Sequence, residues 1–167
     1  MSERLLPKEL FDKARQVVEA NRKLGRRVAV AESCTGGLVC AALTEIPGSS
    51  EIFEAGYVTY SNASKIDDLG VSGEVVETFG AVSVATAWAM ARGALAASKA
   101  DVAVAITGIA GPGGGTPSKP VGTVVFARAE RGSDPSQIVA DQKMFDETTR
   151  SGVRLQAALC ALDLLMP

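Results

Sequence analysis

Two short runs of the chain are apolar at nearly every position and show no alternation between apolar and polar residues. They are Arg27–Ala31 (RVAVA) and Val102–Thr107 (VAVAIT). A strand that faces water on one side alternates in polarity, so strands without alternation are typical of a sheet that is covered on both faces. Because such a sheet needs helices on each side, the two runs predict a layered α/β fold.

Helical and extended patterns alternate along the rest of the chain. Apolar residues at helical spacing, with Pro7 suited to a first turn and Gly25 to a stop, predict a first helix over residues 10–24. Ser83 is an N-cap candidate for an alanine-rich helix that reaches about Lys99. The other expected elements are a helix at Leu38–Thr44, strands at Tyr57–Tyr60, Gly122–Ala129 and Ile138–Phe145, a polar turn at Ser61–Lys65, and a final amphipathic helix with Val153, Ala157, Cys160 and Leu164. This order predicts a single three-layer α/β/α domain over residues 1–167, with a mixed, mostly parallel sheet.

Histidine is absent from all 167 residues. A Ser-His-Asp triad, a Cys-His dyad and a histidine-ligated zinc or iron site are therefore excluded within this chain. The three cysteines, Cys34, Cys40 and Cys160, are widely spaced and form no CxxC pair, which indicates neither a disulfide framework nor a metal site. We expect no metal and no cofactor.

The charge of the chain is nearly balanced, with 17 Lys+Arg against 19 Asp+Glu, a net charge of −2 and a pI near 5.2. Such a chain offers no strong positive field, so we expect neither a nucleic acid nor a membrane as partner. Residues 1–25 carry several charged side chains where a signal peptide would be apolar, and no segment approaches about 18 uncharged apolar residues. These observations predict a cytoplasmic protein.

The segment Glu32–Gly37 (ESCTGG) lies between an apolar strand and a helix, where α/β sheets present their ligands. A hydroxyl at Ser33 would lie beside the backbone amides of residues 35–37, and these amides would form an oxyanion hole. The alternative is that Ser33 or Thr35 only caps the helix and that the glycines only form a tight turn. Cys34 is a second possible nucleophile, which we rank below the serine.

A serine nucleophile needs a base, and in this chain the base cannot be histidine. Lysine can serve when burial or a neighbouring cation lowers its pKa toward neutrality. Lys65 follows the second expected strand and is the most interesting lysine, although an exposed surface lysine is the alternative. The local Ser-x-x-Lys motif is absent, so the fold would have to bring Ser33 and Lys65 together.

The run Gly108–Gly115 (GIAGPGGG) follows the second apolar strand, with Thr107 at its edge. It fits neither the Walker A motif nor the GxGxxG fingerprint. Two readings stay open: the loop binds an anion through its backbone amides, or it covers a pocket as a lid. Lys119 and Arg150 would supply positive charge to a phosphate, or they are ordinary surface residues.

Six motifs occur in a fixed order along the chain: AESCTGG (31–37), PGSS (47–50), VTYSN-x-x-K (58–65), GAVS (80–83), TGIAGPGGG (107–115) and KPVGTV (119–124). With them the sequence, from about Leu10 to Leu165, closely resembles the C-terminal domain family of the competence/damage-inducible protein CinA, whose stand-alone members include nicotinamide-nucleotide amidase. The resemblance implies a three-layer α/β/α fold and metal-free hydrolysis of the carboxamide of nicotinamide mononucleotide, in pyridine nucleotide salvage. It also implies a Ser/Lys dyad, which by motif is Ser33 and Lys65.

A mechanism built on this dyad adds further candidates for the site. Amides near Gly36 and Gly37, with Thr35, would hold the oxyanion, and the substrate would be a small nucleotide. Full-length CinA proteins carry an additional N-terminal domain that resembles molybdopterin-binding proteins, and we expect none of its activities, including pyrophosphatase activity, in this chain. The remaining expected site residues either orient the lysine or the amide (Tyr60, Asn62 and Thr107) or hold ribose and phosphate (Gly108, Gly111, Gly113, Gly114 and Arg150).

Two other functions remain open from the sequence. One is a non-catalytic nucleotide-binding or regulatory module that uses the same loops without turnover. The other is an amidase for a different small amide. The presence of both Ser33 and Lys65 favours an enzyme, because a pure binding module needs neither. We also expect a homo-oligomer, a dimer or larger.

Overall fold

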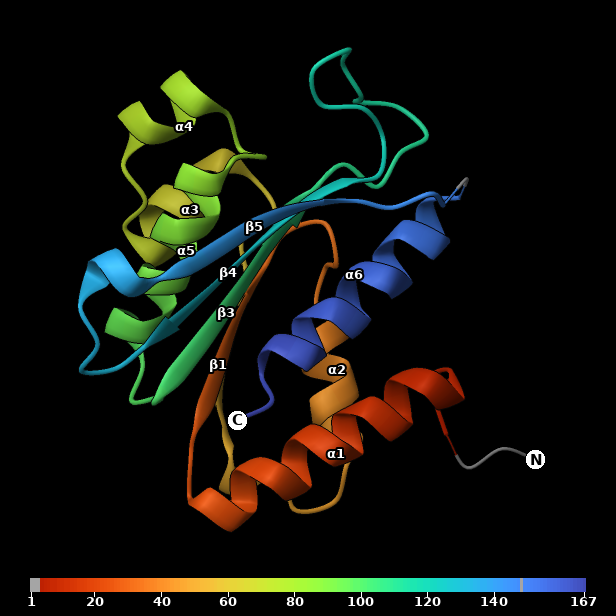
Figure 1. Cartoon of the computed structure of the whole chain (residues 1–167), viewed down its shortest axis with the longest axis vertical. Coiled ribbons are helices and arrows are strands. Elements are labelled where there is room, and N and C mark those ends of the chain that lie inside the picture. Colours follow the sequence, from red (N-terminus) through yellow and green to blue (C-terminus); the bar gives the residue numbers. More distant parts are fainter. Residues whose placement is uncertain (1–3, 148) are drawn as a thin grey trace.

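The computed structural model describes residues 4–147 and 149–167. Its elements follow one another along the chain in the order shown in Figure 1. The helices are α1 (Lys8–Leu24), α2 (Leu38–Thr44), α3 (Asn62–Leu69), α4 (Gly73–Phe79), α5 (Val84–Ala97) and α6 (Arg150–Leu164), and the strands are β1 (Val28–Glu32), β2 (Phe53–Val58), β3 (Val102–Gly108), β4 (Thr123–Glu130) and β5 (Val139–Met144). Single 3₁₀ turns lie at Ser49–Glu51 and Pro135–Gln137.

The five strands form one sheet in the order β2-β1-β3-β4-β5. β1 is parallel to both of its neighbours, whereas β3–β4 and β4–β5 are antiparallel. The mixed sheet is therefore confirmed, but it is not mostly parallel, because the last two strands join by antiparallel pairing and the two kinds of pairing are equal in number. β1 is buried along its whole length, and β3 is buried up to its last residue, as expected for strands without polar alternation.

Helices cover both faces of the sheet, so the three-layer fold is confirmed (Figure 1). Successive strand residues point to opposite faces of the sheet, and in β1 and β3 the side chains on one face are larger than those on the other. The larger valines and Ile106 of β1 and β3 pack against α1, α2 and α6, while the alanines between them pack against α5. Alanine on that face lets the alanine-rich helix α5 lie close to the sheet.

The structure differs from expectation between residues 53 and 79. The second strand starts at Phe53 and ends at Val58, earlier than expected. The expected polar turn is the start of α3, where the Ser61 side chain accepts a hydrogen bond from the Ser64 amide at 3.1 Å. This cap, together with tertiary packing of Lys65 and Leu69, allows a helix although the segment has no apolar stripe. The short helix α4 was not expected either.

The loops that carry the sequence motifs lie together at the end of the sheet where β1, β2 and β3 finish. β1, β2 and β3 are mutually aligned, so residues 33–37, 59–61 and 109–122 all leave the sheet at their carboxyl ends. β4 runs opposite to β3, and β5 runs opposite to β4, so β5 has the same direction as β3 and finishes at the same end of the sheet. Helix α6 starts soon afterwards at Arg150, whose side chain contacts two of these loops through Gly111 and Tyr60.

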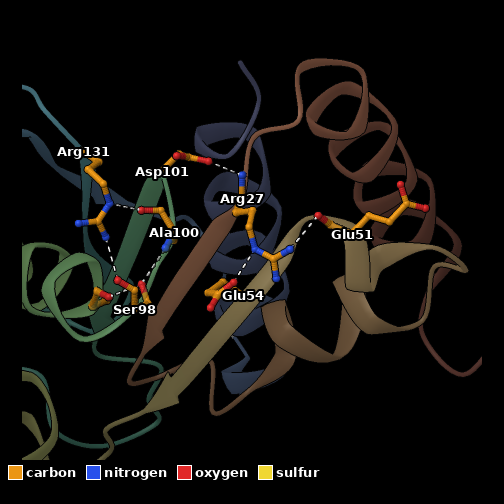
Figure 2. Close-up of polar contacts among 8 residues, drawn as sticks. Arg27, Glu51, Glu54, Ser98, Ala100, Asp101 and Arg131 are labelled. Carbon is orange, nitrogen blue, oxygen red and sulfur yellow. Dashed lines mark hydrogen bonds and ion pairs between the residues drawn. The ribbon is translucent and has the colours of Figure 1, made fainter.

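Two arginines, Arg27 and Arg131, connect elements at the opposite end of the sheet, where β1 and β3 begin (Figure 2). The Arg27 side chain forms an ion pair with Glu54, and its backbone amide donates to the Asp101 carboxylate at 2.7 Å. Arg131 donates to the carbonyl oxygens of Ala100 at 2.8 Å, Ser98 at 2.9 Å and Leu95 at 2.6 Å. All of these contacts except the Arg27–Glu54 ion pair join the backbone of one segment to a side chain of another, and all of them connect neighbouring elements, which is a structural role.

Within the described ranges 4–147 and 149–167, no helix is long and apolar enough to cross a bilayer.

Candidate active site

Ser33 and Lys65 meet in the interior at the carboxyl edge of the sheet. Ser33 directly follows β1, and its amide donates to the Ile106 carbonyl of β3 at 2.9 Å. The Lys65 ammonium nitrogen, Nζ, donates to the Ser33 hydroxyl oxygen at 3.0 Å. Ser33 is 8% exposed and Lys65 is 1% exposed. The alternative of a surface lysine is therefore wrong.

Burial favours the neutral form of Lys65, although the carbonyl oxygens around its Nζ accept hydrogen bonds that favour the ammonium form. Its Nζ also donates to the carbonyl oxygens of Thr59 at 2.7 Å and Tyr60 at 3.4 Å. In the part of the chain that the structure describes, no carboxylate forms an ion pair with it. Burial lowers the pKa of Lys65, and the neighbouring Cys34 opposes this effect only in part. A lysine with a lowered pKa, hydrogen-bonded to a serine hydroxyl, has the geometry of a nucleophile and its base.

Glycines shape the turn that follows Ser33. Gly36 and Gly37 have φ angles of +58° and +98°, which side chains disfavour. The Gly36 amide donates to the Ser33 carbonyl at 3.0 Å, so this turn already uses it. Cys34 lines the pocket, and its amide donates no hydrogen bond to another residue within 4–147 or 149–167. The amide that directly follows a nucleophile is a common oxyanion donor, which makes the Cys34 amide the better placed candidate.

Glu32 is a completely buried carboxylate that the sequence analysis did not single out. Its two oxygens accept hydrogen bonds from the backbone amides of Val39 at 3.1 Å and Cys40 at 3.0 Å. These amides belong to the first turn of α2, whose N-cap residue is Gly37 and has no side chain to cap them. The alternative in which Ser33 or Thr35 caps this helix is therefore wrong. The sequence signal that could have indicated this role is the position of Glu32, a charged residue at the end of an otherwise apolar strand.

Arg154 of α6 is a second residue that the sequence analysis missed. Its Nε donates to the Cys34 carbonyl at 3.2 Å, and its Nη2 donates to the Thr35 carbonyl at 3.1 Å. Arg154 thus joins the turn after Ser33 to a helix on the other side of the sheet from Lys65. Nothing in the sequence pattern of α6 indicates this contact across 119 positions.

A pocket of about 260 Å³ opens above the Ser33–Lys65 pair. Its lining includes seven of the expected binding residues and omits four: Thr35, Gly36 and Gly37 lie on the turn outside the lining, and Asn62 is an exposed residue in the first turn of α3. The lining residues are Ser33, Cys34, Tyr60, Lys65, Ala81, Val82, Thr107, Gly108, Ile109, Ala110, Gly111, Gly113, Gly114 and Arg150.

Hydrogen bonds fix the wall of the pocket. Arg150 donates through Nη1 to the Gly111 carbonyl at 2.7 Å and through Nη2 to the Tyr60 hydroxyl at 2.9 Å. It thereby connects the glycine-rich loop with the chain after β2. The Thr107 hydroxyl donates to the Ala81 carbonyl at 2.9 Å. Lys119 lies outside the lining, and its Nζ donates to the Phe79 carbonyl at 2.8 Å.

The Cys34 thiol is poorly suited to act as the nucleophile. Burial raises the pKa of Cys34 to about 11, and the nearby Glu32 carboxylate acts in the same direction. Arg154 and Lys65 oppose this effect only in part. Because the thiolate is the reactive form, a thiol with this pKa is almost fully protonated at neutral pH.

The pocket offers hydroxyl, amine and backbone amide groups. Across residues 4–147 and 149–167, no three Cys, Asp or Glu side chains are gathered as a metal ion would require.

Comparison with known proteins places these features in a family. Residues 11–167 match the CinA C-terminal domain. A Pseudomonas putida protein named nicotinamide-nucleotide amidohydrolase PncC is 48% identical over 153 residues, which is 92% of each chain. A putative competence-damage inducible protein of Symbiobacterium thermophilum is 51% identical over 146 residues, but the aligned part of this chain spans only 34% of that protein's length.

The fold comparison agrees. The crystal structure of the competence/damage inducible protein CihA from Agrobacterium tumefaciens superposes with a TM-score of 0.92 and 46% sequence identity, over 99% of this chain and 97% of that one. The chain described here therefore belongs to the CinA C-terminal domain family.

Proposed function

We propose that this protein is an amidohydrolase that converts nicotinamide mononucleotide and water to nicotinate mononucleotide and ammonia. The observation that carries the proposal is the buried contact of 3.0 Å between Lys65 Nζ and Ser33 Oγ. The substrate is inferred from the relative of matching length that is named nicotinamide-nucleotide amidohydrolase. A mononucleotide amidase of this kind works in pyridine nucleotide salvage in the cytoplasm.

The first half of the reaction forms an acyl-enzyme. Neutral Lys65 takes the hydroxyl proton of Ser33 while Ser33 Oγ forms a bond with the carboxamide carbon. Charge develops on the carboxamide oxygen, and the Cys34 amide donates to this oxyanion. The C–N bond then breaks, and protonated Lys65 gives its proton to the departing nitrogen, which leaves as ammonia.

The second half releases the acid. Water attacks the ester carbon while Lys65 takes one of its protons, and the bond to Ser33 Oγ breaks as that oxygen regains a proton from Lys65. Nicotinate mononucleotide leaves, and the dyad returns to its starting state. No step needs a metal ion or a redox partner.

The size of the pocket supports a binding mode in which only the nicotinamide ring of the substrate is enclosed. Pockets for drug-sized ligands typically enclose about 300–1,000 Å³, and this one encloses about 260 Å³. It therefore takes the nicotinamide ring, and ribose and phosphate extend past the glycine-rich loop. Arg150 stands at that loop, where a phosphate would compete for its contacts with Gly111 and Tyr60.

The test is ammonia release from nicotinamide mononucleotide by the purified protein, with a metal chelator present. We expect steady release by the wild type and a loss of at least about 1,000-fold in Ser33→Ala and in Lys65→Met. The matched controls are Ser118→Ala and Lys99→Met, which change an exposed serine and an exposed lysine outside the pocket. Both should keep the wild-type rate.

Other outcomes separate the alternatives. Stabilisation of the wild type by nicotinamide mononucleotide without ammonia release would contradict catalysis and support a binding module. Release from another nicotinamide compound but not from the mononucleotide would contradict the proposed substrate and support a different amidase. Full activity of Lys65→Met would contradict its role as the base.

A further inference from the structure

The backbone that carries Ser33 belongs to neither a helix nor a strand. Ser33 is held on one side by its amide, which donates to the Ile106 carbonyl of β3. On the other side the chain runs through a turn up to Leu38, where α2 begins. The distance between Ser33 Oγ and Lys65 Nζ therefore depends on how firmly this turn is fixed.

Three consecutive peptide planes after the nucleophile are each fixed by a hydrogen bond to their carbonyl oxygen. The Ser33 carbonyl accepts from the Gly36 amide, within the turn itself. The next two carbonyls, of Cys34 and Thr35, accept from the single guanidinium of Arg154 at 3.2 and 3.1 Å. The Thr35 carbonyl also accepts from the Leu38 amide at 3.1 Å, whereas the Cys34 carbonyl depends on Arg154. Because a peptide unit is rigid and planar, holding each carbonyl also fixes the amide on the opposite side of that plane.

Arg154 approaches from the side of the sheet opposite to Lys65. α6 packs with α1 and α2 on one face, whereas α3 packs with α5 on the other. The turn with Ser33 thus lies between a lysine from one layer and an arginine from the other. A guanidinium suits this contact because its planar fork reaches two acceptors at once, which the single ammonium of a lysine does not do in a fixed geometry.

We propose that Arg154 is a positioning residue for catalysis, which holds the peptide planes of the Cys34 and Thr35 carbonyls so that the turn keeps Ser33 aligned with Lys65. The plane of the Thr35 carbonyl contains the Gly36 amide, which in turn holds the Ser33 carbonyl and with it the Cys34 amide. Arg154 is not in the pocket lining and does not touch the reacting atoms. This inference rests on the proposed amidohydrolase function. It predicts a defect in the chemical step rather than in substrate binding.

The first experiment compares steady-state kinetics on nicotinamide mononucleotide for Arg154→Met and Arg154→Lys with the wild type. Displacing a reacting group by about 1 Å costs on the order of 100-fold in rate, so we expect kcat to fall about 10- to 100-fold in Arg154→Met, with KM within about 3-fold. Arg154→Lys should recover only part of kcat. An unchanged kcat in folded Arg154→Met would overturn the proposal.

Arg131 provides the matched control, because it is also an arginine that donates to backbone carbonyls, here at the opposite edge of the sheet (Figure 2). Arg131→Met removes comparable contacts far from the pocket. We expect it to lower the melting temperature with kcat within about 2-fold of the wild type. If Arg131→Met and Arg154→Met lower kcat equally at the same folded fraction, Arg154 has only a structural role.

A second readout does not depend on the substrate. Phenylmethylsulfonyl fluoride reacts with activated serines, and its rate of attachment to Ser33 is measured by mass spectrometry, with Ser33→Ala as the blank. We expect slower labelling in Arg154→Met and wild-type labelling in Arg131→Met. If the wild type is labelled but releases no ammonia from nicotinamide mononucleotide, only the proposed function fails. If it shows neither labelling nor turnover, Ser33 is not activated and both proposals fail.

Discussion

Lys65 Nζ donates a hydrogen bond of 3.0 Å to Ser33 Oγ, although the two residues are 32 positions apart and lie on different elements. Two parallel strands make this contact possible. Glu32 is paired with Val58 in the sheet, and the Thr59 amide donates to the Glu32 carbonyl at 2.9 Å. The chain therefore leaves β1 and β2 side by side, and the first turn of α3 carries Lys65 back under Ser33.

The lowered pKa of Lys65 leads to a prediction for the pH dependence of the reaction. Burial lowers its pKa below the ordinary lysine value of about 10.4, so a larger fraction is neutral at any given pH than in free lysine. Since the neutral amine is the proposed base, kcat/KM should rise tenfold per pH unit on the acid side and level off above the lowered pKa. The measurement is kcat/KM from pH 5 to 10. A flat profile would contradict the role of Lys65.

Cys34 should be dispensable for catalysis and slow to react. Its pKa of about 11 keeps the thiol protonated, and the side chain is only 5% exposed. We expect Cys34→Ala to retain kcat within about 5-fold, and iodoacetamide at pH 8 to modify Cys34 far more slowly than a small free thiol. Peptide mass spectrometry measures the modification. Loss of activity in step with Cys34 alkylation in the native protein would contradict its buried, protonated state.

Glu32 should contribute strongly to stability. Glu32→Ala leaves the Val39 and Cys40 amides without acceptors in a buried place, which costs about 2–4 kcal/mol of unfolding free energy. Glu32→Gln keeps one acceptor oxygen and should cost less. Urea unfolding measures both, with Glu54→Ala as the control, because the partly exposed Glu54–Arg27 pair is worth at most about 1 kcal/mol. Equal losses at Glu32 and Glu54 would contradict the capping role.

Gly93 sets the distance between α5 and α3. A Cβ at this position would overlap the Leu69 carbonyl oxygen of α3, so Gly93→Ala must push α3 away although alanine favours helices. We expect the free energy of unfolding to fall by about 1–3 kcal/mol. We also expect kcat to fall, because α3 carries Lys65. Gly113→Ala, where the space around the added methyl is open, is the stability control. Urea unfolding and steady-state kinetics measure the two effects. If Gly93→Ala keeps the wild-type unfolding free energy and kcat, the prediction is contradicted, because α3 then shifts without cost.

Some of the fold and the site could be predicted from local patterns alone. The apolar runs at Val28–Ala31 and Val102–Thr107 correctly predict central strands because burial on both faces leaves a mark on every residue. Ser33 was a candidate from its place after such a strand, and the family motif favoured it over a helix cap; Lys65 became a candidate from the absence of histidine together with that motif. α3 was missed because a short helix capped by Ser61 reads locally as a turn.

The sequence by itself determined the layered α/β sheet, offered Ser33 as a candidate nucleophile and excluded histidine as its base. Only the tertiary structure decided that Lys65 is buried against Ser33, that Glu32 caps α2 and that Arg154 holds the turn. The physical reason is distance along the chain. A hydrogen bond between residues 32 or 120 positions apart depends on strand order and on which helix covers which face, and no local sequence pattern encodes either of these.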